Sequence, residues 1–138
     1  MTRPLPTEPL MLQPMGQLGE ADCAVTALAM YLGRPYREVS EAAMRTSPHV
    51  HQRGLWATEM RRIAKRLGVT LRSVRAPVPN VTERTGILCV KRKTVEHAAV
   101  LFQGVLIDPR DGQLWDLETW VATRCWKVTA LLCLGGDA

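Results

Sequence analysis

The sequence contains few aromatic residues and no long apolar segment. Phe, Trp and Tyr make up 5% of the 138 residues, so the core must come mainly from Leu, Val, Ala, Ile and Met. No segment approaches the ~18 consecutive apolar residues that a membrane span requires. The N-terminal stretch, with Pro4, Pro6 and Pro9, lacks the unbroken apolar run of a secretory signal. We therefore expect a cytoplasmic protein with no membrane partner.

Cysteine and histidine are also scarce, and their spacing does not predict a metal site. The four cysteines stand at positions 23, 89, 125 and 133, without the paired Cys-x-x-Cys pattern of structural zinc sites. Cys89, Cys125 and Cys133 lie in apolar, strand-like runs, which favours buried and reduced thiols in a chain without secretory features. His49 and His51 fall in a polar loop with no third ligand nearby, so no metal or other cofactor is expected.

The positive charge is spread along the chain. The formal net charge is +5, and the sequence pI is near 9.4. Basic residues fall at Arg61–Arg66, at Arg72 and Arg75, and at Lys91–Lys93, with no aromatic residues between them to stack on bases. This pattern favours a solvated basic face over a nucleic-acid site. A nucleic-acid-associated protein is therefore the least favoured of the functional hypotheses that the sequence allows.

The periodicity of the apolar residues changes along the chain from helical to strand-like. We expect a proline-rich arm over residues 1–15, one domain over 16–134 and a short tail over 135–138. The expected helices are Cys23–Leu32, Tyr36–Met44, Leu55–Leu67 and Asp116–Thr123, and the expected strands are Val69–Val74, Gly86–Lys91, His97–Phe102, Val105–Asp108 and Cys125–Leu134. Helices followed by antiparallel strands predict an α+β fold, with the helices packed on the sheet.

Cys23 stands where the first helix is expected to begin, directly after Asp22, a residue type that favours the N-cap position. Unpaired N–H groups and the helix dipole stabilise a thiolate there, and the thiolate is the nucleophilic form of cysteine. The helix is apolar nearly all round and is therefore expected to be buried, with Gly33 at its end. Gln17, in a glycine-containing loop, is placed to donate to an oxyanion together with the Cys23 N–H.

A base for this thiol is predicted on the sheet. His97 is the one histidine in a predicted strand, and Gln103-Gly104 predicts a hairpin after it. With that turn, Ala99 lies opposite Asp108, and His97 lies diagonal to Asp108 on the same face. Asp108 is therefore the expected orienting partner of His97, and Asp111 is the alternative.

Several segments together resemble the double-glycine leader peptidases, which are papain-like cysteine peptidases that process bacteriocin precursors. The similarity covers Gln17-Leu-Gly-Glu-Ala-Asp-Cys23-Ala, the following helix to Gly33, the helix that ends at Gly68, and the block from His97 through Asp108 to Gly112. The resemblance implies a papain-like fold. The leader peptidases are typically the N-terminal part of an exporter, whereas this sequence shows no membrane region, so we expect a stand-alone domain. The resemblance also implies that Cys23 is the nucleophile, His97 the base, Asp108 its orienter and Gln17 part of the oxyanion hole.

The primary hypothesis is therefore a cysteine hydrolase, a peptidase that cleaves an amide bond through a thioester. Its expected partners are a protein or peptide substrate and a further protein that supplies specificity. A deamidase or acyl transferase would use the same site. A non-catalytic papain-like module that binds a peptide or partner is the alternative from another class. Self-processing at Gly135-Gly136 is a further hypothesis, and a frayed tail is the simpler interpretation.

Overall fold

The computed structural model describes residues 22–48 and 57–135. The proline-rich arm, Gln17, both loop histidines and Gly136 lie outside the described residues, so the expectations about them stay predictions. Within the described part, no helix has the length and apolar character needed to cross a bilayer.

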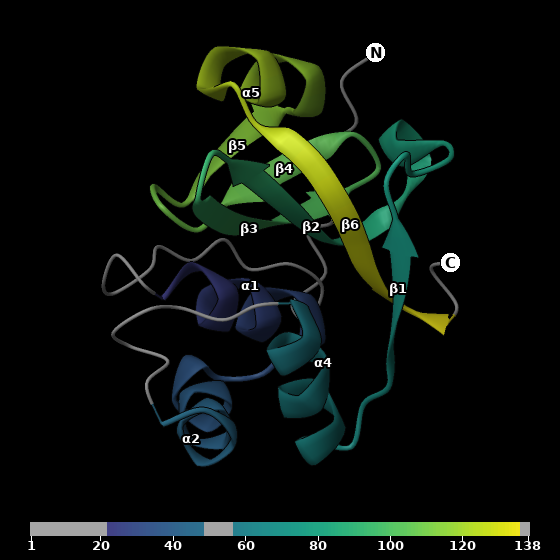
Figure 1. The fold of residues 1–138 in the computed structure, drawn as a ribbon. Coiled ribbons are helices and arrows are strands. Elements are labelled where there is room, and N and C mark those ends of the chain that lie inside the picture. Colours follow the sequence, from purple (N-terminus) through teal and green to yellow (C-terminus); the bar gives the residue numbers. More distant parts are fainter. Residues whose placement is uncertain (1–21, 49–56, 136–138) are drawn as a thin grey trace.

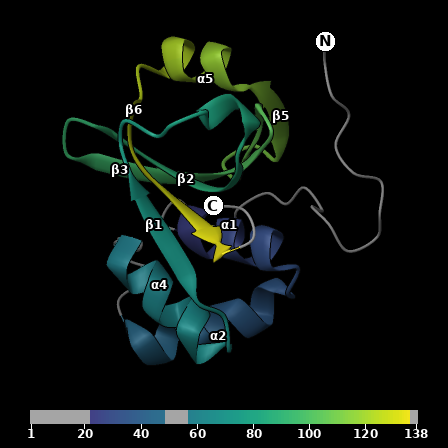
Figure 2. The same ribbon diagram turned by 90° about the vertical axis from the view of Figure 1, so that its right-hand side faces the viewer.

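Three helices from the first half of the chain lie together on one side of the sheet (Figures 1 and 2). They are α1 (Cys23–Leu32), α2 (Tyr36–Thr46) and α4 (Ala57–Arg66). As the apolar run predicts, α1 is buried along nearly its whole length. Gly33 ends α1 with a positive φ of 66° and donates its N–H back to the last turn, which confirms the predicted stop. The predicted start of this helix at Leu55 lies outside the described residues, and α4 is described from Ala57 onward.

The second half of the chain forms a six-stranded antiparallel sheet in the order β1-β6-β2-β3-β4-β5. Its strands are β1 (Leu71–Arg75), β2 (Thr85–Arg92), β3 (Val95–Phe102), β4 (Val105–Asp108), β5 (Gln113–Asp116) and β6 (Lys127–Leu134). A 3-10 turn, η1 (Val81–Glu83), precedes β2, and α5 (Leu117–Arg124) precedes β6. The described residues therefore confirm an α+β fold of helices packed on an antiparallel sheet.

Both faces of the central strands are buried, which explains why β2 and β6 read as continuous apolar runs. Ile87, Cys89 and Val100 pack with α1, α2 and α4 in one hydrophobic cluster. Leu88 and Leu101, which alternate with them, pack on the opposite face with Leu117 and Trp120 of α5, and with Trp126. Figure 1 shows α5 on the side of the sheet away from α1. The end of the sheet nearest His97 thus lies between a helical layer and a tryptophan-rich layer.

The structure corrects one expectation about the end of the chain and adds a strand that was not predicted. Cys125 is exposed and lies outside β6, in a left-handed conformation (φ 57°) that ends α5. The chain reverses there, so the apolar residues on both sides of Cys125 belong to different elements. The strand β5 is also absent from the prediction, because four residues, Gln-Leu-Trp-Asp, are too short to show a clear period.

Candidate active site

Cys23 is the first residue of α1, and it is only 9% exposed. Asp22 occupies the N-cap position as predicted, but its side chain makes no capping hydrogen bond to the helix. Instead its Oδ2 accepts a hydrogen bond from the Tyr36 hydroxyl at 2.8 Å. Burial, together with the hydrogen bond to Asp22, raises the pKa of Tyr36 to about 12. The Asp22 carboxylate therefore accepts no hydrogen bond from the N–H groups at the start of α1, and these groups favour a negative charge such as a thiolate or an oxyanion.

The hairpin between β3 and β4 brings His97 to Asp108, and the predicted register is confirmed. Phe102 pairs with Val105 and Val100 with Ile107, around a turn at Gln103-Gly104 in which both residues have positive φ. This pairing continues to place Ala99 opposite Asp108 and His97 diagonal to it. The distance from His97 Nε2 to Asp108 Oδ1 is 2.7 Å. His97 and Asp108 are eleven positions apart in the sequence, and the two-residue turn brings their strands side by side.

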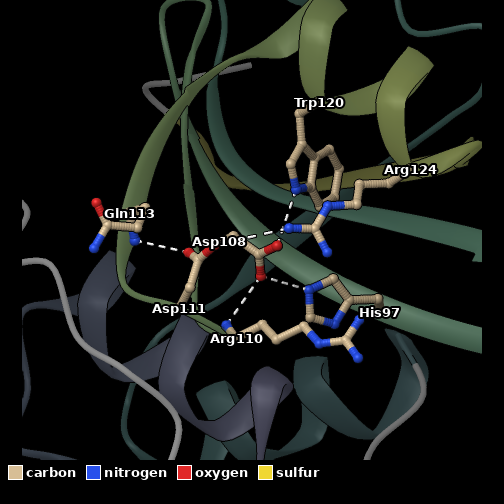
Figure 3. Close-up of polar contacts among 7 residues, drawn as sticks. All are labelled: His97, Asp108, Arg110, Asp111, Gln113, Trp120 and Arg124. Atoms are coloured by element: carbon tan, nitrogen blue, oxygen red, sulfur yellow. Dashed lines mark hydrogen bonds and ion pairs between the residues drawn. The ribbon is translucent and has the colours of Figure 1, made fainter.

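Asp108 is buried, and its carboxylate accepts hydrogen bonds from three donors (Figure 3). Oδ1 accepts from His97 Nε2 and from the Arg110 backbone N–H at 2.9 Å, and Oδ2 accepts from Trp120 Nε1 at 2.9 Å. Burial by itself raises the pKa of Asp108, but the hydrogen bonds and the positive charge of His97 outweigh it. The pKa of Asp108 is therefore held below its ordinary value, and the group is ionised at neutral pH.

The ionised Asp108 fixes the orientation of the His97 ring. An ionised carboxylate can only accept hydrogen bonds, so Nε2 of His97 must carry the proton that faces Asp108. Nδ1 is then the ring nitrogen that does not face Asp108. Burial lowers the pKa of His97, but the hydrogen bonds with Asp108 and Cys23 and their negative charges raise it to about 9. Cys23, His97 and Asp108 thus form one electrostatically coupled chain.

Two tryptophans enclose this pair and were not predicted as part of the site. The indole of Trp126 stacks on the His97 ring with centroids 5.4 Å apart and 15° between the planes. The ring centroid of Trp120 lies 6.1 Å from that of His97 and 5.9 Å from that of Trp126. Arg92 lies over the Trp126 ring, with its guanidinium carbon 4.7 Å from the ring centroid. These contacts depend on how α5 folds back over the sheet, which no local pattern in the sequence indicates.

The remaining site predictions have different outcomes. Gln17 lies outside the described residues, so its role in an oxyanion hole stays a prediction. Asp111 accepts a hydrogen bond from the Gln113 backbone and lies 3.9 Å from Arg124, which places it in the turn rather than on His97. Among residues 22–48 and 57–135, no group of three or more potential ligands is arranged to hold a metal ion.

Comparison with known proteins agrees with this arrangement at the level of the family. A search of curated protein sequences found no match. A family model described as the Peptidase C39 family matches residues 12–132, a range that includes Gln17, Cys23, His97 and Asp108. The match covers most of the 138 residues, and a papain-like fold agrees with the observed helices and sheet. The chain therefore belongs to the Peptidase C39 family.

Proposed function

We propose that this protein is a cysteine peptidase that cleaves an amide bond through a thioester intermediate. The observation that carries the proposal is the coupling of three groups from α1, β3 and β4. Cys23 begins a helix, it interacts with His97, and His97 Nε2 lies 2.7 Å from the buried Asp108. Membership in the Peptidase C39 family supports the assignment to cysteine peptidases. The roles of the individual residues are our proposal.

In the proposed reaction, His97 moves one proton between two partners. Nδ1 accepts the proton of the Cys23 thiol, and the sulfur attacks the carbonyl carbon of the substrate to form a C–S bond. The C–N bond then breaks, and the leaving amine takes the proton from Nδ1. A water molecule then attacks the thioester carbon and gives a proton to Nδ1, the C–S bond breaks, and Nδ1 returns that proton to the Cys23 sulfur as the carboxylic acid leaves. Asp108 stays ionised throughout and holds the ring by Nε2.

The oxyanion that forms on the carbonyl oxygen needs donors close to Cys23. The backbone N–H of Cys23, at the start of α1, is one such donor. We propose Gln17 as the second donor, from its spacing before Cys23 in the sequence. The substrate that best fits the leader-peptidase resemblance is an unstructured, glycine-containing segment. Transfer of the acyl group to an amine would use the same thioester, and the product distinguishes the two reactions.

A proteome-derived peptide library tests the proposal across many candidate substrates at once. The library is incubated with the protein in water enriched in ¹⁸O, and new peptide ends are identified by mass spectrometry. We expect cleavages that carry one ¹⁸O atom in the new carboxylate, and we expect their loss with Cys23→Ala and His97→Ala. Cys125→Ala is the matched control, because Cys125 is an exposed thiol outside the site. Cleavage that persists in Cys23→Ala would refute the proposal.

A further inference from the structure

Four exposed cations lie at the end of the sheet nearest Cys23 and His97. They are Lys91, Arg92, Lys93 and Lys127, and we call them the basic rim. The strand register brings them together, because Lys91 of β2 pairs with Lys127 of β6 on one side. On its other side Lys91 pairs with Glu96 of β3, and Glu96 is the one carboxylate in the segment from Lys91 to His97. The rim therefore keeps a clear excess of positive charge.

The register also places cations of the basic rim on both faces of the sheet beside His97. Val90 pairs with His97, so Lys91 and Arg92 are the next two residues of β2 beyond it. Lys91 and Lys127 share a face of the sheet with Cys89, the face against which α1 packs. Cys89 is close enough to Cys23 and Glu96 for both to raise its pKa, after the larger effect of burial. Arg92 points to the opposite face, where it covers Trp126 beside His97.

The distance from His97 to the basic rim determines how far from the scissile bond a charged substrate residue would meet these cations. Residues 93–94 form the turn between β2 and β3, three to four positions from His97. At ~3.3 Å per residue this is about 10–13 Å, the span of three to four residues in an extended peptide. A substrate that lies along this end of the sheet would therefore meet cations within about four residues of its scissile bond.

From this geometry we infer that the protein selects peptide substrates with acidic side chains close to the scissile bond. The inference rests on the proposed peptidase function and adds a substrate class to it. Exposed cations attract an acidic peptide mainly through encounter rate and orientation, an effect that salt screens over about 10 Å. The preference is therefore expected in low salt and is expected to weaken as salt is added.

Reactive peptides of defined charge test the inference. Three glycine-rich peptides of equal length carry an N-terminal iodoacetyl group and three Glu, three Gln or three Lys residues. The protein carries Cys125→Ser so that the exposed second thiol does not consume the reagent. We expect the Glu peptide to alkylate Cys23 about tenfold faster than the Gln peptide at low salt and the Lys peptide to be slowest, with the ratio falling to about twofold in 0.5 M salt.

Charge-removing variants locate the preference. Lys91→Gln with Lys127→Gln is expected to reduce the Glu-over-Gln ratio to about twofold to threefold, since each exposed pair contributes only modestly. Arg62→Gln with Lys65→Gln is the matched control, because these exposed residues lie on α4, which packs against the edge strand β1. β6 and β2 separate β1 from β3. Equal rates for all three peptides, or a full preference in the Lys91/Lys127 variant, would overturn the inference.

Two further measurements keep this result separate from the proposed function. Iodoacetamide, which is small and neutral, reports the intrinsic reactivity of Cys23 and should react equally with the rim variant and the control. An unreactive Cys23 would count against the peptidase proposal alone, because anisotropy with unreactive acetylated peptides still measures the charge preference. Tighter binding of a short single-stranded DNA than of the Glu peptide would assign the rim to nucleic acid and would also overturn the inference.

Discussion

Asp108→Asn, alone and combined with Trp120→Phe, tests whether every group that hydrogen-bonds to the buried Asp108 carboxylate is a donor. The groups that face Asp108 are His97 Nε2, the Arg110 N–H and Trp120 Nε1, and each is a donor. An amide at this position must turn its NH₂ group toward at least one of them. If its oxygen keeps the two bonds to His97 and Arg110, then its nitrogen meets the Trp120 N–H. We therefore expect Asn to fit poorly despite its equal size.

The magnitude follows from the number of bonds lost. Loss of one charge-assisted hydrogen bond costs about 1.5–3 kcal/mol, and each unsatisfied buried donor costs about 1–3 kcal/mol. Asp108→Asn should therefore lower the free energy of unfolding by about 3–5 kcal/mol, as is usual when a buried ion pair is broken. Trp120→Phe removes the opposing N–H, so it should cost about 1–3 kcal/mol less in the Asn background than in the wild type.

Urea unfolding at pH 7, followed by circular dichroism for all four proteins of the cycle, measures this coupling. Asp116→Asn is the matched control. Asp116 accepts a hydrogen bond from the Thr119 N–H at the start of α5, and Asn is an equally good N-cap, so less than about 0.5 kcal/mol should be lost. Additive effects of the two site substitutions, or an Asp108→Asn variant as stable as Asp116→Asn, would refute the reasoning.

Two other predictions concern the same pair of strands. The pKa of His97 rises from 6.5 to about 9 on folding, so its contribution to stability should be complete below about pH 6.5 and should be lost, by up to about 3 kcal/mol, as the pH rises to 9. The lowered pKa of Asp108 adds stability that is lost as the pH falls below 4. Urea titrations should show the loss between pH 6.5 and 9 in the wild type and not in His97→Ala, since the raised pKa values of Tyr36 and Cys89 lower the stability of both proteins only at higher pH. Gly104→Ala should lower the free energy of unfolding by about 1–3 kcal/mol and slow the alkylation of Cys23. Gly104 has a φ of 88°, and a Cβ there would lie 3.0 Å from the Thr82 carbonyl oxygen. An unchanged melting temperature would contradict this reasoning.

The local signals in the sequence predicted most of the fold. The apolar run after Asp22 predicted a buried helix, and Gly33 predicted its end. Gln103-Gly104 predicted the hairpin, and alternation along its strands was enough to bring His97 to Asp108. Register in a tight hairpin depends on the turn and the pleat, which are both local properties.

What the sequence did not predict depends on packing between distant elements. The hydrogen bond from Trp120 to Asp108 requires α5 to fold back over β4, and no periodicity encodes that return. The apolar neighbours of Cys125 predict a strand there, but the chain reverses at that residue in a left-handed conformation. Likewise, Asp22 had the right residue type for capping, and its side chain bonds to Tyr36 of the next helix instead.

The relative alkylation rates of Cys23 and Cys125 at pH 6 test the central claim most directly. Exposure alone predicts that Cys125 reacts first, because it is exposed and Cys23 is only 9% exposed. Activation by the His97–Asp108 pair predicts the reverse order, with Cys23 reacting at least about tenfold faster, since His97 is protonated at pH 6 and its positive charge stabilises a thiolate beside it. His97→Ala should abolish this advantage. Cys125 reacting first in the wild type, or an unchanged Cys23 rate in His97→Ala, would contradict the proposed active site.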